Sequence, residues 1–383
     1  MSSTSSPARA LPGKRERFST RVAFFVAGFG MASWAPMVPL AKQRAGLDDG
    51  TLGLVLLCLG AGSILAMPLA GYLTARWGCR RVITAAGLMI CLMLPLLASV
   101  STLPLLVAAV LLFGAGMGML DCAINIQAVI VEKASERAMM SGFHGLFSLG
   151  GIMGAVGMTA LLSLGLAPLI AALAVVAVLL VAMYRAVPHL LPFGSASDGP
   201  LFAVPHGIVL FLSVLCFIVF LTEGAMLDWS AVFLVSERQM DANYAGLGYA
   251  AFATTMTIGR LTGDAIVNRL GGARVTLIGG LFAAVGMAIS IWVPAWPAAL
   301  LGYALVGAGC SNIVPVLYTA VGRQTTMAQS AAVPAMTTLG YAGILMGPAA
   351  IGFIAHLANL PLALGVLVLL LAAVAFSGRW LRV

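Results

Sequence analysis

The sequence predicts an all-α integral membrane protein, with twelve transmembrane helices arranged in two pseudo-symmetric six-helix bundles. The first observation is composition: 61% of the 383 residues are hydrophobic, only 8% are charged, and the mean hydropathy is +1.07. A soluble domain would carry about 25% charged residues. The second is that the apolar segments have the length of a bilayer span, about 20 residues. The third is an internal repeat that relates the two halves of the chain.

Twelve apolar segments are long enough to cross a membrane as helices. Residues 1–20 are predicted to be a disordered cytoplasmic tail, because they are polar and basic and lack the apolar core of a signal peptide. The N-terminal bundle is expected over 21–184 and the C-terminal bundle over 206–383. A cytoplasmic linker over 185–205 joins them, since its Pro, Gly and Ser residues interrupt the helical pattern. The expected spans are 21–41, 51–74, 82–100, 103–131, 139–163, 166–184, 206–235, 244–268, 274–292, 296–320, 329–353 and 358–378.

The net charge of +8 could indicate a nucleic-acid partner, but the positions of the charges argue against one. Nearly all Lys and Arg residues fall on one side of the expected spans, and the exceptions are Lys42, Arg44 and Arg238. The positive-inside rule therefore places both termini in the cytoplasm, in a protein of the bacterial inner membrane. The six cysteines show neither a disulfide framework nor a metal-binding spacing, so no metal is expected.

The two halves of the chain match each other in order and at a nearly constant offset. Ser-Trp-Ala at 33–35 matches Asp-Trp-Ser at 228–230, and Gly-Ala-Gly at 114–116 matches the same tripeptide at 307–309. Polar side chains are almost absent from every third span, which predicts that one helix of each three-helix unit faces lipid. Glycines that recur four residues apart would let the other helices pack closely.

Two short loops carry a motif of a known family. GYLTARWGCRR at 71–81, and its echo GDAIVNRLGGAR at 263–274, resemble the basic loop motif of the major facilitator superfamily of secondary transporters. Within that superfamily, four longer strings look like a bacterial branch near the fucose permeases, the YbjJ-type transporters. These strings are DCAINIQAVIVE at 121–132, SGFHGLFSLGG at 141–151, EGAMLDWSAVFL at 223–234 and SNIVPVLYTAVGR at 311–323.

The resemblance implies the fold of the major facilitator superfamily, in which the two bundles rock about a central site and open it to each side in turn. In the family motif an aspartate makes a charge contact between the bundles. Here its two positions hold Ala75 and Asn268, so that contact is not expected. Arg76, Arg80 and Arg269 match basic positions of the motif and are expected to be gating or structural charges.

Asp121 is the residue around which the predicted site is organised. It lies in an apolar span, where a charged side chain costs about 2.5–3.5 kcal/mol on insertion scales, and Asn125 lies one helical turn away on the same face. We expect Asp121 to accept a proton and its charge state to set the conformation. A hydrogen-bond acceptor that fixes two helices is the alternative. Glu223 is the second proton-coupling candidate.

Further polar residues are expected to gate the pathway or to brace the helices. Arg260 and Asp264, four residues apart, are expected to form an ion pair that organises the cytoplasmic gate. Asp228 with Trp229 is a candidate gate or interfacial anchor. His144 is a candidate proton relay or a hydrogen-bonded structural residue. The candidate substrate-binding residues are Trp34, Asn125, Gln127, Ser148, Asn312, Thr338 and Tyr341.

The sequence contains no nucleotide-binding, nucleophile-elbow or metalloprotease motif, so enzymatic activity, cofactors and ATP as an energy source are not expected. The favoured hypothesis is a monomeric proton-coupled symporter for a small polar, sugar-like solute, whose partners are that solute, protons and the lipid bilayer. Two alternatives stay open. One is a proton-driven exporter of amphipathic compounds, and the other is a membrane receptor or scaffold that binds a solute without transporting it.

Overall fold

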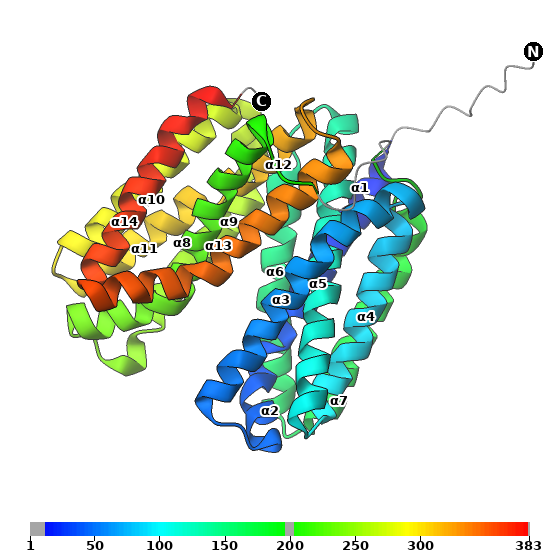
Figure 1. Cartoon of the computed structure of the whole chain (residues 1–383), viewed down its shortest axis with the longest axis horizontal. Coiled ribbons are helices and arrows are strands. Elements are labelled where there is room, and N and C mark those ends of the chain that lie inside the picture. The colour runs from blue at the N-terminus through cyan, green and yellow to red at the C-terminus, as the bar shows by residue number, and fades with distance from the viewer. Residues whose placement is uncertain (1–11, 196–202, 382–383) are drawn as a thin grey trace, which may run out of the picture.

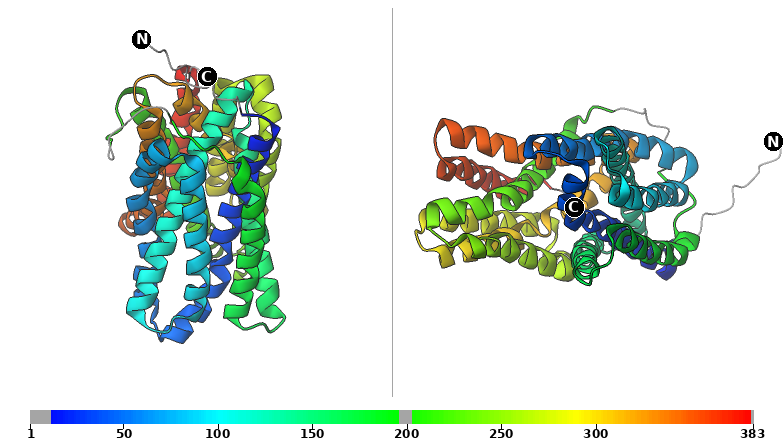
Figure 2. Two further views of the ribbon diagram at one scale, coloured as in Figure 1. Left: turned by 90° about the vertical axis from the view of Figure 1, so that its right-hand side faces the viewer. Right: turned by 90° about the horizontal axis from the view of Figure 1, so that it is seen from below.

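The computed structural model describes residues 12–195 and 203–381, and these residues form α-helices and short 3-10 turns without strands. The helices make two groups that stand side by side (Figures 1 and 2). The N-terminal group contains α1 (Lys14–Ser33), α2 (Val38–Ala45), α3 (Asp49–Trp77), α4 (Cys79–Ser99), α5 (Leu103–Ser135), α6 (Met140–Ser163) and α7 (Pro168–Ala186). The C-terminal group contains α8 (Gly207–Arg238), α9 (Leu247–Leu270), α10 (Gly272–Trp292), α11 (Trp296–Cys310), α12 (Ile313–Arg323), α13 (Gln329–Leu357) and α14 (Leu360–Ser377).

Eleven helical segments of the described residues are long and apolar enough to cross a membrane, with α1 and α2 counted as one segment and α11 and α12 as another. Helix α9 completes the set of twelve spans. Its 24 residues extend about 36 Å, but Arg260, Asp264 and Arg269 make it less apolar than the others. The expected fold of twelve spans in two six-helix bundles is therefore confirmed.

Two expected spans are each broken into two helices. The first break follows α1 at Pro36, and the second lies at Ser311, between α11 and α12. A proline has no N–H to donate, and its ring clashes with the carbonyl four residues earlier. Ser311 lies four residues before Pro315, so the second break is where that clash falls. The spans expected over 21–41 and 296–320 are therefore both present, each as two consecutive helices.

The first helix begins earlier than the sequence suggested. Helix α1 starts at Lys14, inside the segment 1–20 that was expected to be a disordered tail. The backbone N–H of Gly13 donates to Oε2 of Glu16 at 2.7 Å, and this bond satisfies one of the free N–H groups at the helix start. The remaining part of that expectation concerns residues 1–11, which lie outside the described residues.

Glycines set how closely the helices pack inside each bundle. A Cβ atom on Gly114 of α5 would collide with the carbonyl of Leu59 in α3, and one on Gly150 of α6 would collide with α1. In the C-terminal bundle, Gly343 of α13 packs in the same way against the backbone of Phe217 in α8. Backbone contact of this kind leaves no room for side chains to rearrange. Each bundle is therefore built to move as a unit.

The two bundles meet at one end of the molecule, where α1 begins and α14 ends, and their helices diverge toward the other end (Figure 1). We call these the joined end and the splayed end. The helix pairs that join the bundles are α3 with α13 and α6 with α9, together with contacts of α12 to α5 and α6. Near the joined end, Gly71 of α3 packs against Ser330 and Pro334 of α13.

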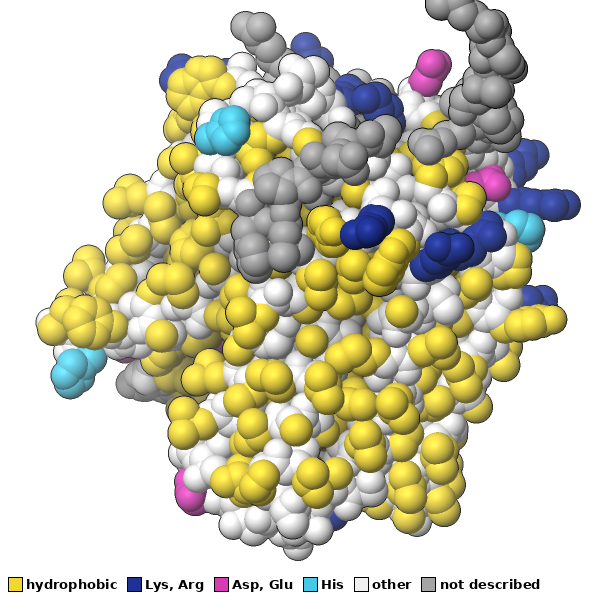
Figure 3. All heavy atoms as spheres, turned by 45° about the vertical axis from the view of Figure 1, so that its right-hand side comes forward, with side chains coloured by type: hydrophobic (Ala, Val, Ile, Leu, Met, Phe, Trp, Pro, Cys, Tyr) yellow, Lys and Arg dark blue, Asp and Glu magenta, His cyan; other side chains and the backbone are white. Residues whose placement is uncertain are grey.

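Hydrophobic side chains cover the sides of the molecule, whereas Lys and Arg side chains gather mainly toward the joined end (Figure 3). Leu65, Leu92 and Leu369 are among the large side chains left exposed on the helices, at 70%, 63% and 72%. An apolar surface of this extent would be unstable in water, and it fits a lipid environment. The surface agrees with a protein that crosses the membrane several times.

Two of the three basic residues on the splayed side have matching structural roles. Arg44 donates to the carbonyls of Val100 and Leu97 at the C-terminal end of α4, at 2.8 and 2.6 Å. Arg238 donates to the carbonyls of Ser290 and Ile291 at the C-terminal end of α10. A cation is favoured at a helix C-terminus, where carbonyl groups lack partners. The internal repeat thus extends to a pair of arginine caps.

Replacing either cap residue is expected to destabilise its own bundle without changing transport specificity. We expect Arg44→Ala and Arg238→Ala each to lower stability by about 1 kcal/mol, because each leaves helix carbonyls without a charged donor. The check is thermal unfolding of the purified protein in detergent. Arg185→Ala, at an exposed position in the last turn of α7, is the control and is expected to have little effect.

Candidate functional site

An arginine links the two bundles at the centre of the molecule. Nη2 of Arg260 in α9 pairs with Oε1 of Glu223 in α8 at 3.0 Å, and Nη1 donates to Oγ of Ser148 in α6 at 3.1 Å. The side chains of Arg260 and Glu223 are 9% and 18% exposed. Because Ser148 belongs to the N-terminal bundle, Arg260 joins the two halves. We call these three residues the Arg260 bridge.

The Arg260 bridge corrects one expectation from the sequence. Arg260 was expected to pair with Asp264 one turn along the same helix, but its partner is Glu223 of the neighbouring helix. A buried acid without a cation is costly, so Glu223 holds the arginine. Asp264 has another partner: its Oδ1 accepts the backbone N–H of Gly142 in α6 at 2.9 Å.

Asp121 lies at the interface of the bundles with little to balance its charge. The side chain is buried, with 8% exposed, and Nδ2 of Asn125 donates to its backbone oxygen at 2.9 Å and to Oδ1 at 3.4 Å. No Lys, Arg or His among the described residues forms an ion pair with it. Asp121 is close enough to Tyr318 and Tyr341, both of the C-terminal bundle, to interact with them electrostatically.

Tyr341 of α13 lies within electrostatic range of both Asp121 and Glu223. Its ring packs edge to face with Phe220 at a centroid distance of 6.0 Å. Tyr318 was not among the candidates from the sequence; its hydroxyl shares a hydrogen bond of 2.9 Å with that of Thr337.

His144 lies at the same interface, one helical turn before Ser148 on α6. Its ring lies tilted against the rings of Phe24, at a centroid distance of 5.3 Å, and Tyr318, at 5.4 Å. Nε2 is buried and has no hydrogen-bond partner among the described residues. It is also close enough to Arg260 to interact with it electrostatically. Of the two sequence interpretations, a structural histidine that is hydrogen-bonded through Nε2 does not match this arrangement.

Gln127 does not line the interface, although it was a substrate-binding candidate. It is fully buried, its Nε2 donates to Oγ1 of Thr20 at 2.9 Å, and its Oε1 accepts the N–H of Leu191 at 3.1 Å. Both bonds stay within the N-terminal bundle and the start of the linker. The reason is helix geometry: two residues beyond Asn125 the side chain points to another face.

We expect Gln127→Leu to lower stability by about 2 kcal/mol, since it leaves the buried N–H of Leu191 without a partner and removes the donor to the Thr20 hydroxyl. The relative rates at which different solutes are transported are expected to stay unchanged. Thermal unfolding in detergent and a transport panel measure the two effects. Gln43→Leu, at an exposed position of α2, serves as the matched control. A change in the relative transport rates of different solutes in Gln127→Leu, but not in Gln43→Leu, would contradict the structural role.

Two candidates of the C-terminal bundle form no hydrogen bond with Asp121 or the Arg260 bridge in the described part of the chain. Nδ2 of Asn312 donates to the carbonyl of Gly259 at 3.1 Å and to Oγ of Ser311 at 3.0 Å, so its donors fasten α12 to α9 inside one bundle. Thr338 lines a groove between α3, α13 and residues 203–205. Its neighbour Thr337 is the one that points toward Tyr318.

The repeated tryptophans lie nearer the splayed end. Trp34, at the end of α1, is 4% exposed, and its Nε1 has no partner among the described residues. Nε1 of Trp229 donates to the carbonyl of Pro348 at 3.2 Å and ties α8 to α13. Asp228, beside it, is exposed. The geometry gives Trp229 a bracing role and leaves Trp34 as the tryptophan with a free donor.

The start of α6 is held by acids and amides from both bundles. Oε2 of Glu132 accepts the N–H groups of Met139 and Met140 at 2.7 and 2.8 Å, and its Oε1 accepts the hydroxyl of Thr319 in α12. Carboxylates are favoured at a helix N-terminus, where N–H groups are free. Sequence reasoning missed Glu132, because nothing in its spacing shows that it is buried.

From the other bundle, Asn268 of α9 binds both backbone groups of Ala138. Its Oδ1 accepts the N–H at 2.9 Å and its Nδ2 donates to the carbonyl at 3.0 Å. Asn268 carries no charge and so cannot make the charge contact of the family motif, but it joins the two bundles through these two hydrogen bonds. Together with the Asp264–Gly142 and Glu132–Thr319 bonds, these contacts form what we call the α6 latch.

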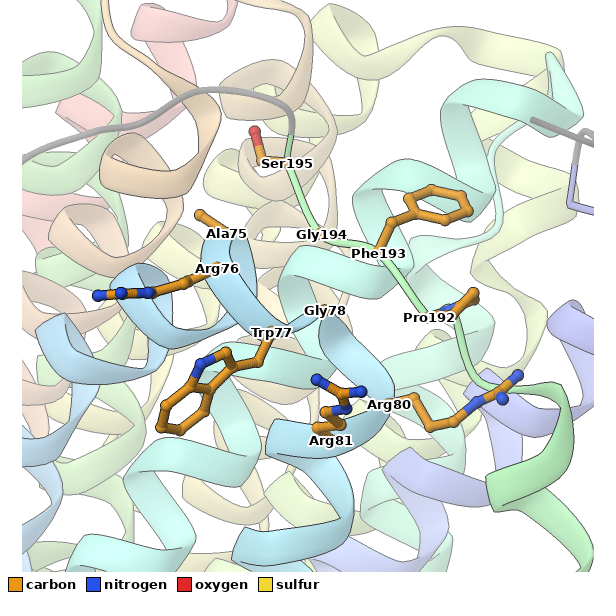
Figure 4. A pocket seen from close by; sticks show the side chains of 10 residues that line it. All are labelled: Ala75, Arg76, Trp77, Gly78, Arg80, Arg81, Pro192, Phe193, Gly194 and Ser195. Carbon is orange, nitrogen blue, oxygen red and sulfur yellow. The ribbon is translucent and has the colours of Figure 1, made fainter. Parts of the chain in front are cut away.

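Arg80 of the first loop motif holds the linker. A pocket of about 460 Å³ lies between the loop that joins α3 to α4 and residues 192–195 (Figure 4). Arg80 donates to the carbonyls of Leu190 and Pro188 at 2.9 and 2.7 Å, and Arg76 donates to the hydroxyl of Tyr72 at 2.9 Å. Arg269, in the second motif, is exposed at the end of α9. These hydrogen bonds of Arg76 and Arg80 stay within the N-terminal half.

Two helix bundles that meet at a buried ion pair and an isolated acid define a membrane transporter of the alternating-access class. The chain matches the Major Facilitator Superfamily profile over residues 22–295, and it belongs to that superfamily. It is 58% identical over 369 residues, 96% of both chains, to an uncharacterized MFS-type transporter of Yersinia pestis. It is 31% identical over 362 residues to the membrane protein MosC of Rhizobium meliloti, covering 92% of this chain and 87% of the relative.

Solved structures with this fold include transporters of low sequence identity. A crystal structure of the transporter FucP in the outward conformation has a TM-score of 0.80 at 18% identity, covering 95% of this chain and 98% of the other. The human organic anion transporter MFSD10 has a TM-score of 0.76 at 15% identity, covering 95% and 99%. At these identities the likeness shows the fold alone. The resemblance to fucose permeases is confirmed at that level.

Proposed function

We propose that the protein is a proton-coupled secondary transporter that imports a small polar organic solute across the bacterial inner membrane by alternating access. The observation that carries this proposal is Asp121, a buried acid between the bundles that has no ion pair in the described part of the chain. Ionisable side chains at membrane depth usually mark solute or proton pathways. A single chain would act as a monomer, because its two bundles together enclose the site.

The orientation follows from the distribution of basic side chains. Lys and Arg gather mainly toward the joined end (Figure 3), and the positive-inside rule would place that end, with both termini, in the cytoplasm. The splayed end would then face outward. The likeness to FucP in its outward conformation supports this assignment.

Two acids in series can carry a proton from outside to inside. Glu223, with 18% of its side chain exposed, would receive the proton, and the more deeply buried Asp121 would pass it on. Tyr341, which interacts with both, lies on this route. A proton that crosses 100 mV releases about 2.3 kcal/mol, enough to accumulate a solute about fifty-fold.

A sugar-like solute is favoured because the interface offers carboxylate, hydroxyl and amide groups, which can exchange hydrogen bonds with hydroxyl groups. Asp121, Asn125 and Ser148 supply these from the N-terminal bundle, and Tyr341 from the other. Two solved transporters of this fold are named as proton symporters of sugars: the fucose:proton symporter FucP of E. coli, at 17% identity, and the proton:xylose symporter XylE, at 13%.

The test is solute-driven proton entry into proteoliposomes that enclose a pH-sensitive dye. Pentoses, hexoses and their aldonic and uronic acids are added one at a time at constant ionic strength. We expect at least one of them to acidify the vesicle interior, and Asp121→Asn to remove the signal. Acidification by none of them, with correctly oriented protein, would refute proton-coupled import of a sugar-like solute.

A further inference from the structure

We propose that the transported solute carries an acidic group, which binds Arg260 once Glu223 has taken up a proton. The inference rests on the proposed function and names the class of solute at the same site. The solute is not a neutral sugar, because a cation, Arg260, lies at the contact between the bundles.

The first step is the count of charges around Glu223. Among the described residues, Arg260 is the group that forms an ion pair with it, so the pair is neutral as a unit. The other titratable groups that interact with Glu223 from neighbouring helices carry no charge at neutral pH. They are Tyr249 of α9, Cys310 of α11 and Tyr341 of α13. A proton on Glu223 would therefore leave Arg260 as a buried cation without a balancing charge.

The second step is that a buried, unbalanced guanidinium is unfavourable and needs a new anion. Arg260 is 7% exposed and its Nε has no hydrogen-bond partner among the described residues. A carboxylate can accept two parallel N–H groups of a guanidinium, which a neutral hydroxyl cannot do. Proton and acidic solute would enter together, and the charge of the site would be the same before and after loading.

The third step concerns the groups on the opposite bundle. His144 and Ser148 lie one turn apart on α6; Ser148 already accepts a hydrogen bond from Arg260, and Nε2 of His144 has no partner among the described residues. His144 is close enough to Arg260 to interact with it electrostatically. An anion held by Arg260 could therefore also reach the N-terminal bundle. Binding to both halves is what allows a solute to promote the change between conformations.

A neutral solute fits the same groups less well. It would leave the ion pair between Arg260 and Glu223 intact, and so it would not favour binding of a proton at Glu223. An acidic solute competes with Glu223 for Arg260, and this competition couples the two binding events. Coupling by competition is reciprocal, so protonation of Glu223 should tighten binding of the acid by the same factor that the acid favours protonation.

The experiment compares solutes that differ only in the acidic group. D-glucose and D-glucuronate, D-galactose and D-galacturonate, and sorbitol and gluconate form three matched pairs. Each member is tested for proton entry into proteoliposomes and for binding to the purified protein by thermal shift. We expect the acid of at least one pair to bind and to move protons, and its neutral partner to do neither.

The outcomes separate this inference from the function on which it rests. If neutral members move protons and acids do not, or if both do so equally, the solute is not recognised by its acidic group, while proton-coupled transport stands. If no member moves protons, the proposed function fails and this inference fails with it.

Variants of the ion pair provide a second readout. In Glu223→Gln, the acid is expected to bind with an affinity that no longer depends on pH, because Arg260 is permanently free. In the double variant Glu223→Gln/Arg260→Met, which keeps the charge balance and so is expected to fold, binding of the acid should weaken at least about ten-fold. Arg274→Met, at an exposed position of α10, is the matched control. Unchanged acid binding in the double variant would overturn the proposal.

Discussion

Asp121→Asn is expected to abolish accumulation of the solute against its gradient. An asparagine keeps the size of the side chain and the hydrogen bond from Asn125 to the backbone oxygen, but its amide cannot take up or release a proton at physiological pH. Accumulation driven by a pH difference of one unit should fall from about ten-fold to none, because the proton no longer accompanies the solute. The measurement is uptake into proteoliposomes under an imposed membrane potential and pH gradient.

The control for this prediction is exchange, which needs no net proton movement. Asp121→Asn vesicles loaded with unlabelled solute should still exchange it for labelled solute outside, since both bundles and the Arg260 bridge are intact. Asp121→Glu, which keeps a titratable group, should retain part of the accumulation. Full accumulation by Asp121→Asn would show that another residue couples transport to protons.

The fold could be predicted from the sequence because its signals are local. These signals are the hydropathy of each span, the glycine runs and the repeat between the halves. The structure contains the features they predict, as the close packing of Gly114 on α3 illustrates. The breaks at Pro36 and Ser311 were harder to place. Proline marks where a helix is weakened, but whether neighbouring helices hold the chain straight depends on tertiary packing.

The site could be predicted only in part, because partners depend on three-dimensional neighbours. Arg260 and Asp264 have a spacing that favours a pair on one helix, yet each finds a better partner across a helix contact. The partners of Asn and Gln side chains are the hardest to predict, since an amide can both donate and accept hydrogen bonds. Gln127, a candidate for substrate binding, is structural within one bundle. Asn268, where no charge contact was expected, joins the two bundles by hydrogen bonds.

The last prediction concerns the α6 latch and the equilibrium between conformations. Asp264→Ala is expected to shift the protein away from the conformation described here and toward one in which the joined end is open. Its carboxylate accepts the N–H of Gly142 across the bundle interface. Loss of a charged acceptor at a partly exposed position should cost about 1–2 kcal/mol, a shift of about five- to thirty-fold in the ratio of the two states.

The shift can be measured as a distance between spin labels at the splayed end. Leu164→Cys, just after α6, and Tyr244→Cys, just before α9, report on opposite bundles, and both positions are exposed. Cys58 would be replaced by serine, while the other five cysteines are buried. Because rigid bundles that part at one end approach at the other, Asp264→Ala should add a shorter distance. Thr262→Ala is the control, since the Thr262 hydroxyl bonds only to its own helix. A distance distribution in Asp264→Ala identical to that of Thr262→Ala would mean that Asp264 does not hold the bundles together.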